Sequence, residues 1–168
     1  MQRRTLLKVG MGAGALLTVA GAGVVLWTPG WTKDGLSAPA RDVFAAVARA
    51  VLDGTLPEAA AGREAALAAH LRRLEASIAG LAPATRQELS ELLAMLSLAP
   101  GRVALAGLGP RWADASVAEL QAALQAMRVS SIATRQQVYH ALRDLTNAAY
   151  YAEPATWAQL GYPGPTPV

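Results

Sequence analysis

The sequence predicts an all-α protein. We expect a bundle of about five amphipathic helices, with an N-terminal signal or anchor segment before it and an extended tail rich in proline and aromatic residues after it. Apolar residues recur three and four positions apart along most of the chain, as on the buried face of a helix. No window shows the sustained alternation of apolar and polar residues that is typical of a half-buried strand.

The first element is an uncharged segment behind a basic start. The motif at the start consists of Arg3, Arg4, Leu6, Leu7 and Lys8. Residues 9–27 then carry no charge and are rich in glycine and alanine. Paired arginines ahead of such a stretch are typical of a twin-arginine export signal, which directs folded proteins across the inner membrane. An ordinary secretory signal or a membrane anchor with a basic start is the alternative.

The sequence leaves open whether this segment is removed. A membrane span needs roughly 17–25 apolar residues, so residues 9–27 are long enough to remain as an anchor. The basic start would then be cytoplasmic, and Trp27 and Trp31 would lie at the far interface. Ala38-Pro39-Ala40 is a candidate cleavage site, but its central proline argues against it. We assign residues 1–31 to the signal and favour an uncleaved anchor.

The remaining chain divides into a linker at residues 32–37, a helical domain at residues 38–150 and a tail at residues 151–168. Apolar rows in the domain predict five helices, at residues 42–53, 62–78, about 85–96, 116–127 and about 132–150. Thr85-x-x-Glu88 and Ser116-x-x-Glu119 both have the pattern of a capping box that opens a helix.

Composition excludes several classes of function. The net charge of +3 equals the three basic residues of the N-terminal motif, so the rest of the chain is neutral and has no basic stripe for nucleic acid. The chain has no cysteine, which excludes disulfides, thiolate zinc sites, iron–sulfur clusters and covalent c-type haem. We expect this chain to hold no cofactor and to bind no nucleic acid.

Residues with catalytic potential are few. His70 and His140 are the only histidines. His140 and Asp144 are spaced to share a helix face, where a surface hydrogen bond is the expected role and a metal site the alternative. The glycine-rich stretch at residues 101–110 follows a helix, so it lacks the strand–turn–helix context of a dinucleotide loop and is predicted to be a surface connection. We expect no catalytic and no metal-binding residues.

The tail is the second distinctive segment. Tyr150, Tyr151, Trp157 and Tyr162 fall within thirteen residues, and four prolines follow or interrupt them. Bulky aromatic groups on a stiff segment suit a docking surface, because little entropy is lost on binding. The alternative is that the tail wraps back over its own bundle and seals the core.

Both ends of the domain resemble the small-subunit family named after gluconate 2-dehydrogenase subunit 3. The first helix, Val43 to Leu52, runs into Thr55-Leu56-Pro57, as in that family. The tail pattern consists of Tyr151, Pro154, Trp157, Leu160, Gly161, Tyr162, Pro163, Gly164 and Pro165. The resemblance covers most of residues 38–165, but only its two ends are specific.

The resemblance implies a non-catalytic partner of a large FAD-dependent dehydrogenase of the glucose–methanol–choline type. In that family the small subunit supplies the export signal for the flavin subunit, and a cytochrome c subunit often takes the electrons. FAD is thus expected in the partner, and the tail residues from Tyr151 to Gly164 are the expected partner-binding set. The translocase would be a second partner and the periplasm the destination. The alternative is a stand-alone, membrane-tethered periplasmic helical protein.

Replacing Arg3 and Arg4 together by lysine should stop export of the protein and of any partner that travels with it. The reason is that the paired arginines are the recognition element of this signal. Cell fractionation measures the outcome. A double variant that still reaches the periplasm would contradict the assignment of the N-terminus.

Overall fold

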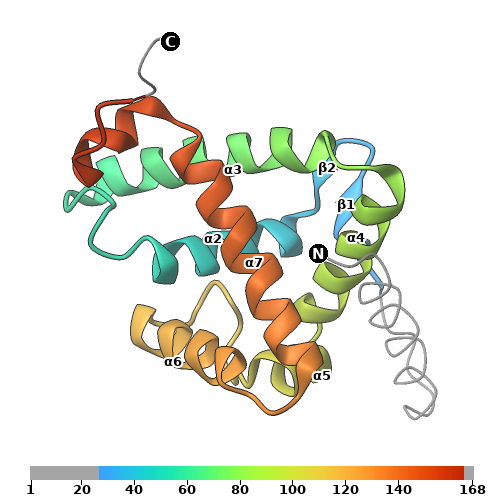
Figure 1. Cartoon of the computed structure of the whole chain (residues 1–168). Helices are drawn as coiled ribbons and strands as arrows, with labels where there is room; N and C mark the ends of the chain where they lie inside the picture. Colours follow the sequence, from blue (N-terminus) through green and yellow to red (C-terminus); the bar gives the residue numbers. More distant parts are fainter. Residues whose placement is uncertain (1–26, 165–168) are drawn as a thin grey trace, which may run out of the picture.

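The computed structural model describes residues 27–164, so the export motif at residues 3–8 and most of the uncharged segment lie outside the described residues. The described part is mainly helical, as the sequence predicts (Figure 1). The long helices are α2 (Ala38–Val51), α3 (Ala60–Ala79), α4 (Pro83–Ser97), α6 (Val117–Arg128) and α7 (Ala133–Tyr151). Shorter helical pieces are α5 (Ala99–Gly101), a π-helix (Arg102–Ala106) and a 3₁₀ helix (Pro154–Leu160).

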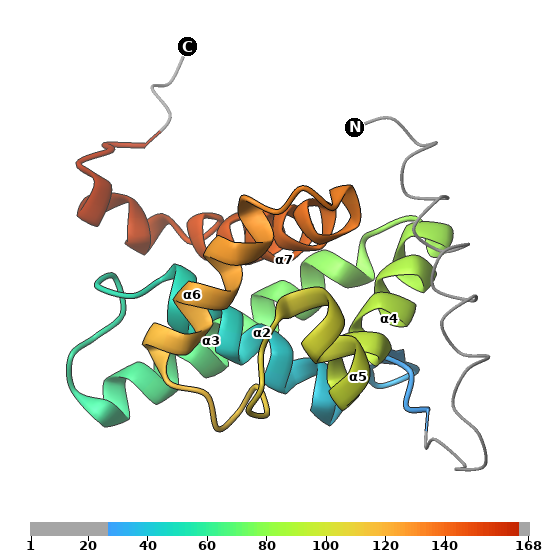
Figure 2. The same ribbon diagram turned by 90° about the horizontal axis from the view of Figure 1, so that it is seen from below.

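Helix α2 lies at the centre and packs against α3, α4, α6 and α7 (Figures 1 and 2). Its buried residues are Ala40, Val43, Phe44, Ala46, Val47, Ala48 and Ala50. Four of these seven are alanines, whose small side chains let neighbouring helices approach closely. A helix that is apolar on most sides is stable only when it is enclosed, so the other helices must surround it.

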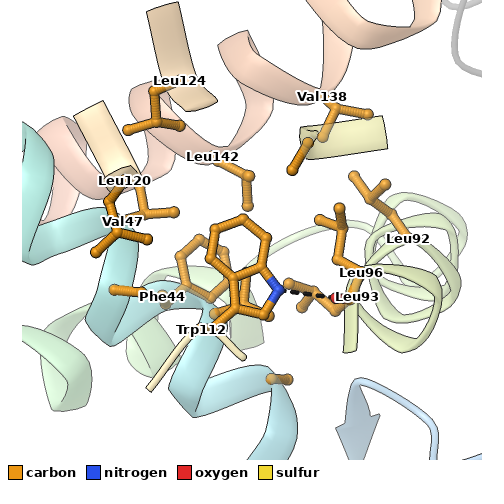
Figure 3. Close-up of a cluster of buried hydrophobic side chains, with 14 of the residues drawn as sticks. Phe44, Val47, Leu92, Leu93, Leu96, Trp112, Leu120, Leu124, Val138 and Leu142 are labelled. Carbon is orange, nitrogen blue, oxygen red and sulfur yellow. Dashed lines mark hydrogen bonds between the residues drawn. The ribbon is translucent and has the colours of Figure 1, made fainter. Parts of the chain in front are cut away.

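The core gathers where α2, α4, α6 and α7 meet (Figure 3). The indole of Trp112, which lies on the loop before α6, enters this core, and its N–H donates to the carbonyl of Leu96 at 2.8 Å. A buried tryptophan needs such a partner for its one polar group. Around it lie Phe44, Val47, Leu92, Leu93, Leu120, Leu124, Val138 and Leu142.

One of the two predicted capping boxes forms. The Ser116 hydroxyl accepts from the backbone N–H of Glu119, whose carboxylate accepts from the N–H of Ser116, and α6 begins there. The other prediction is wrong, because α4 begins at Pro83, with Ala82 as its N-cap, and Thr85 lies inside the helix. Proline fixes a helical φ and needs no partner for an N–H in the first turn, so it starts the helix earlier.

The glycine-rich stretch is not a simple surface connection. Residues Arg102–Ala106 form a π-helix, and Arg102, Ala106 and Leu108 are buried. The guanidinium of Arg102 donates to the carbonyls of Leu108 at 3.2 Å and Gly109 at 3.0 Å. Carbonyls outside regular helices need donors, and this side chain supplies them. Ala106 and Leu108 thus pack in the core, while Val103, Ala104, Gly107 and Gly109 stay exposed.

Part of the predicted linker is also folded. β1 (Trp31–Thr32) and β2 (Gly35–Leu36) form an antiparallel hairpin in which Trp31 faces Leu36. The hairpin is fixed to α4 and α3, since Trp31 N–H donates to the Ser90 hydroxyl at 2.9 Å and Leu36 N–H donates to Glu75 at 3.1 Å. Within residues 27–164 no single helix is long and apolar enough to cross a membrane; only α4 taken together with residues 99–106, bent by 94°, meets that criterion.

Gly30→Ala should destabilise the protein by about 1–3 kcal/mol, the usual cost of forcing atoms into a packed site. A Cβ at this position would lie 2.5 Å from the Cβ of Leu93 and 2.7 Å from the carbonyl oxygen of Ser90. Urea unfolding followed by circular dichroism measures the change. Gly109→Ala is the matched control, because its Cβ would meet nothing within 4 Å. Equal stability of the two variants would show that Gly30 does not pack as described.

Candidate docking site at the C-terminal tail

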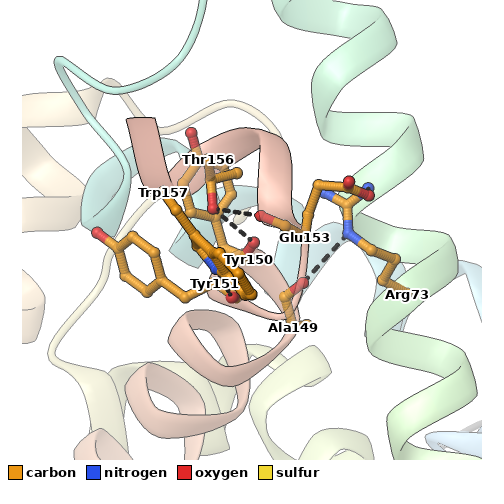
Figure 4. A network of polar contacts seen from close by, with 7 residues as sticks. All are labelled: Arg73, Ala149, Tyr150, Tyr151, Glu153, Thr156 and Trp157. Atoms are coloured by element: carbon orange, nitrogen blue, oxygen red, sulfur yellow. Dashed lines mark hydrogen bonds and ion pairs between the residues drawn. The ribbon is translucent and has the colours of Figure 1, made fainter. Parts of the chain in front are cut away.

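The tail was predicted to be extended, but its first half is not. Residues Pro154–Leu160 form a 3₁₀ helix that directly follows α7 (Figure 4). Pro154 opens it, because its fixed φ suits a first turn and its missing N–H needs no partner. Gly161 closes it with a φ of 67°, which favours glycine. The proline that suggested an extended segment is therefore the residue that starts a helix.

Gly161 also sets the direction of the residues after the helix. The N–H of Tyr162 donates to the carbonyl of Trp157 at 3.1 Å, and the N–H of Gly161 donates to that of Ala158 at 3.2 Å. This pair of bonds is the Schellman arrangement, which reverses the chain at a helix end. The reversal brings Tyr162 and Gly164 back towards Trp157.

Trp157 is the centre of a small aromatic cluster within the tail. Its indole N–H donates to the carbonyl of Tyr151 at 2.7 Å. Its ring lies 5.5 Å from the ring of Tyr162, and Gly164 approaches so closely that a Cβ there would lie 3.4 Å from the indole. Trp157 is half-buried and belongs to neither of the two core clusters, whereas Tyr162 is 49% exposed. These residues form the outer face of the tail.

The base of the tail is fixed to α3. The guanidinium of Arg73 donates to the carbonyl of Ala149 at 3.2 Å and lies 3.5 Å from the carboxylate of Glu153 (Figure 4). The hydroxyl of Thr156, which is buried, donates to the carbonyl of Glu153 at 2.7 Å. These contacts hold the base of the tail against α3.

Among the aromatic residues of the tail, Tyr150 fits the interpretation that the tail seals the bundle. Tyr150 is buried against Ala48 and Leu52, and its hydroxyl donates to the carbonyl of Thr55 at 3.1 Å, so it seals the bundle. Tyr151 is half-buried and packs edge-on against Tyr150. The structure brings Tyr151, Trp157, Tyr162 and Gly164 together, and Pro154 and Pro163 are exposed beside them. The side chain of Leu160 is outside what the structure describes.

The burial of His70 beside this site was not predicted from the sequence. His70 is fully buried, and neither ring nitrogen has a hydrogen-bond partner. Its ring lies 6.2 Å from that of Tyr150. Burial, and secondly the nearby Arg73 guanidinium, lowers the pKa of His70 from 6.5 to about 4. A signal was available: His70, Leu74 and Ile78 are spaced by four and form the buried row of α3.

His140 lies on the exposed side of α7, with its ring 5.2 Å from that of Tyr139. The hydrogen bond expected between His140 and Asp144 does not form; Asp144 accepts from Arg143 at 3.1 Å instead. Among residues 27–164, no group of three or more His, Asp or Glu side chains is placed to hold a metal ion.

Comparisons of the chain with protein families, with curated proteins and with solved structures found no match.

The buried His70 makes a prediction about acid stability. A histidine whose pKa is about 4 when folded and about 6.5 when unfolded binds fewer protons in the folded state. Above pH 6.5 the histidine is neutral in both states, and its protonation does not affect the free energy of unfolding. As the pH falls from 6.5 to 4, only the unfolded state takes up a proton, which lowers the free energy of unfolding by about 3 kcal/mol at 1.36 kcal/mol per pKa unit. Unfolding free energies at pH 7 and pH 4 measure it.

His70→Phe should remove this part of the pH dependence, because phenylalanine has a similar shape and does not titrate. His140→Phe is the control and should keep it, since His140 is exposed. The explanation fails if the two variants lose the same amount of stability between pH 7 and pH 4.

Proposed function

We propose that this chain is the small, non-catalytic subunit of a periplasmic FAD-dependent dehydrogenase of the glucose–methanol–choline type. It supplies the twin-arginine export signal, escorts the folded flavoprotein subunit across the inner membrane and stabilises it. FAD belongs to the partner, and a cytochrome c subunit is a further member of such a complex. The substrate of the partner enzyme is not specified by any residue of this chain.

The observation that carries the proposal is the pair Arg3-Arg4, followed by Leu6-Leu7-Lys8 and an uncharged stretch. This export route transports folded proteins, so a small chain that uses it is well suited to carry a folded companion. The charge balance agrees with a protein partner, because the chain beyond the motif is neutral and lacks a basic stripe.

The tail supports a docking role by its geometry. Trp157 is held by a hydrogen bond to Tyr151 and by the ring of Tyr162, so its position is fixed within the tail itself. Large aromatic side chains that are already ordered lose little entropy on binding. Tyr162, about half exposed, offers its ring to a partner. The same pattern of residues is the one that resembles the small-subunit family.

A stand-alone, membrane-tethered periplasmic protein is the second candidate. The observation that favours it is that the indole N–H of Trp157 already has a partner in its own chain, the carbonyl of Tyr151. A tail that satisfies its own polar groups needs no other protein to be stable. Purification of the chain from its membrane or periplasm, with a yellow flavoprotein present or absent, separates the two candidates.

Trp157→Ala and Tyr162→Ala should each weaken capture of the flavoprotein by about thirtyfold, which corresponds to a loss of about 2 kcal/mol at an aromatic anchor. The bundle should keep its thermal midpoint, because neither residue belongs to the core clusters. Co-purification of the flavoprotein with tagged variants measures the first effect, and thermal unfolding measures the second.

Val129→Ala is the matched control. Val129 is 64% exposed and lies at the end of α6, away from the tail, so its loss should leave capture unchanged. If Trp157→Ala and Tyr162→Ala both bind the flavoprotein like the unmodified protein, the docking role of the tail is refuted.

A further inference from the structure

The folded domain begins abruptly at Gly30. Trp27, Thr28 and Pro29 are exposed, whereas Gly30 is buried. The N–H of Gly30 donates to the carbonyl of Ser90 at 3.1 Å, and its own carbonyl accepts from the N–H of Ser37 at 2.9 Å. No space remains for a side chain at this position. The linker was expected at residues 32–37, but these residues are folded with the domain, so only Thr28 and Pro29 separate the uncharged segment from Gly30.

This short connection limits the distance between the domain and Trp27. Three residue steps separate Trp27 from Gly30, and an extended chain covers at most about 3.6 Å per step, or about 11 Å in total. The hairpin is fixed to the domain by Ser90 and Glu75, so it cannot extend the connection without losing these bonds. The hairpin end of the domain thus stays close to Trp27.

We propose that residues 9–27 remain on the exported protein as its membrane anchor and hold the β1–β2 end of the domain against the lipid headgroups. This rests on the export assignment of the proposed function. Residues 9–27 have the length of a span, and tryptophan is favoured at the membrane interface, where Trp27 would lie. The hairpin end of the domain would accordingly contact the surface of the bilayer.

The structure also argues against removal of the segment at Ala38-Pro39-Ala40. Cleavage there would remove the hairpin and cut the first turn of α2, in which Ala40 is fully buried. It would also remove the bond from Leu36 N–H to Glu75. A protease would have to unfold this end of the domain to reach the peptide bond that follows Ala40.

The orientation has a consequence for the docking site. The hairpin and the C-terminal tail lie at opposite ends of the domain in both views (Figures 1 and 2). With the hairpin at the membrane, Trp157 and Tyr162 face away from the bilayer, where a large folded partner has room. The two ends of the chain thus have separate roles, one towards the lipid and one towards the partner.

The absence of cysteine allows a direct test, because a single introduced cysteine can be labelled with a fluorescent dye. Lys33→Cys and Asp34→Cys place the dye at the exposed hairpin turn, and Ala155→Cys places it on the exposed tail. The full chain is reconstituted in vesicles of phosphatidylcholine and phosphatidylglycerol with a nitroxide on a fraction of the headgroups. Dyes at both hairpin positions should lose most of their emission, and the dye on the tail should keep most of it.

Intact mass of the protein from the membrane fraction is measured first and should correspond to a chain that retains residues 9–27. A chain that begins within or after these residues overturns the anchor. Equal quenching at the hairpin and the tail, or stronger quenching at the tail, overturns the orientation. No partner is needed in this experiment, so its failure is distinct from a failure to capture a flavoprotein.

Discussion

Enclosure of helix α2 is the constraint on which the arrangement of the other helices depends. Seven of its 14 residues are buried, the exposed polar residues are confined to Arg41 and Asp42 near its start, and Phe44 projects into the middle of the core. Such a helix is stable only when other apolar surfaces cover it. Helices α3, α4, α6 and α7 each supply one apolar stripe, and the loop before α6 adds Trp112. The bundle is thus organised around one helix and not around a symmetric seam.

Arginine side chains hold the irregular segments to this bundle. Arg102 and Arg135 donate to carbonyls of the π-helix region and the loop after it, and Arg49 donates to the carbonyl of Trp112. Arg73 does the same at the end of α7. Guanidinium groups suit this role because they carry five donors in a fixed plane, and carbonyls outside regular helices lack backbone donors. These arginines therefore contribute to the fold instead of forming a basic surface.

The separation of the two ends follows from the same packing. The hairpin is fixed to α4 and to Glu75 near the C-terminal end of α3. The tail, by contrast, continues α7 beyond the bundle. The chain therefore presents its N-terminal connection and its aromatic tail in different directions (Figure 1). Under the proposed function, this arrangement would let the chain attach to the membrane at one end and to the flavoprotein at the other without obstruction. The neutral domain between them adds no strong electrostatic attraction of its own.

The sequence by itself determined the helical class, the approximate positions of the five long helices and the capping box at Ser116, because these depend on residues three or four positions apart. Only the tertiary structure decided the hairpin, the buried Arg102 and the folded tail. The bonds that fix the hairpin and the base of the tail join distant residues: Trp31 to Ser90, 59 positions away, and Arg73 to Ala149, 76 positions away. Arg102 bonds to carbonyls only six and seven positions away, but its burial depends on the helices packed around it. The burial of His70 was not predicted, although its spacing of four and eight from Leu74 and Ile78 is that of the buried row of α3. Local patterns specify which helices form, whereas contacts between distant residues decide which polar and irregular segments become part of the core.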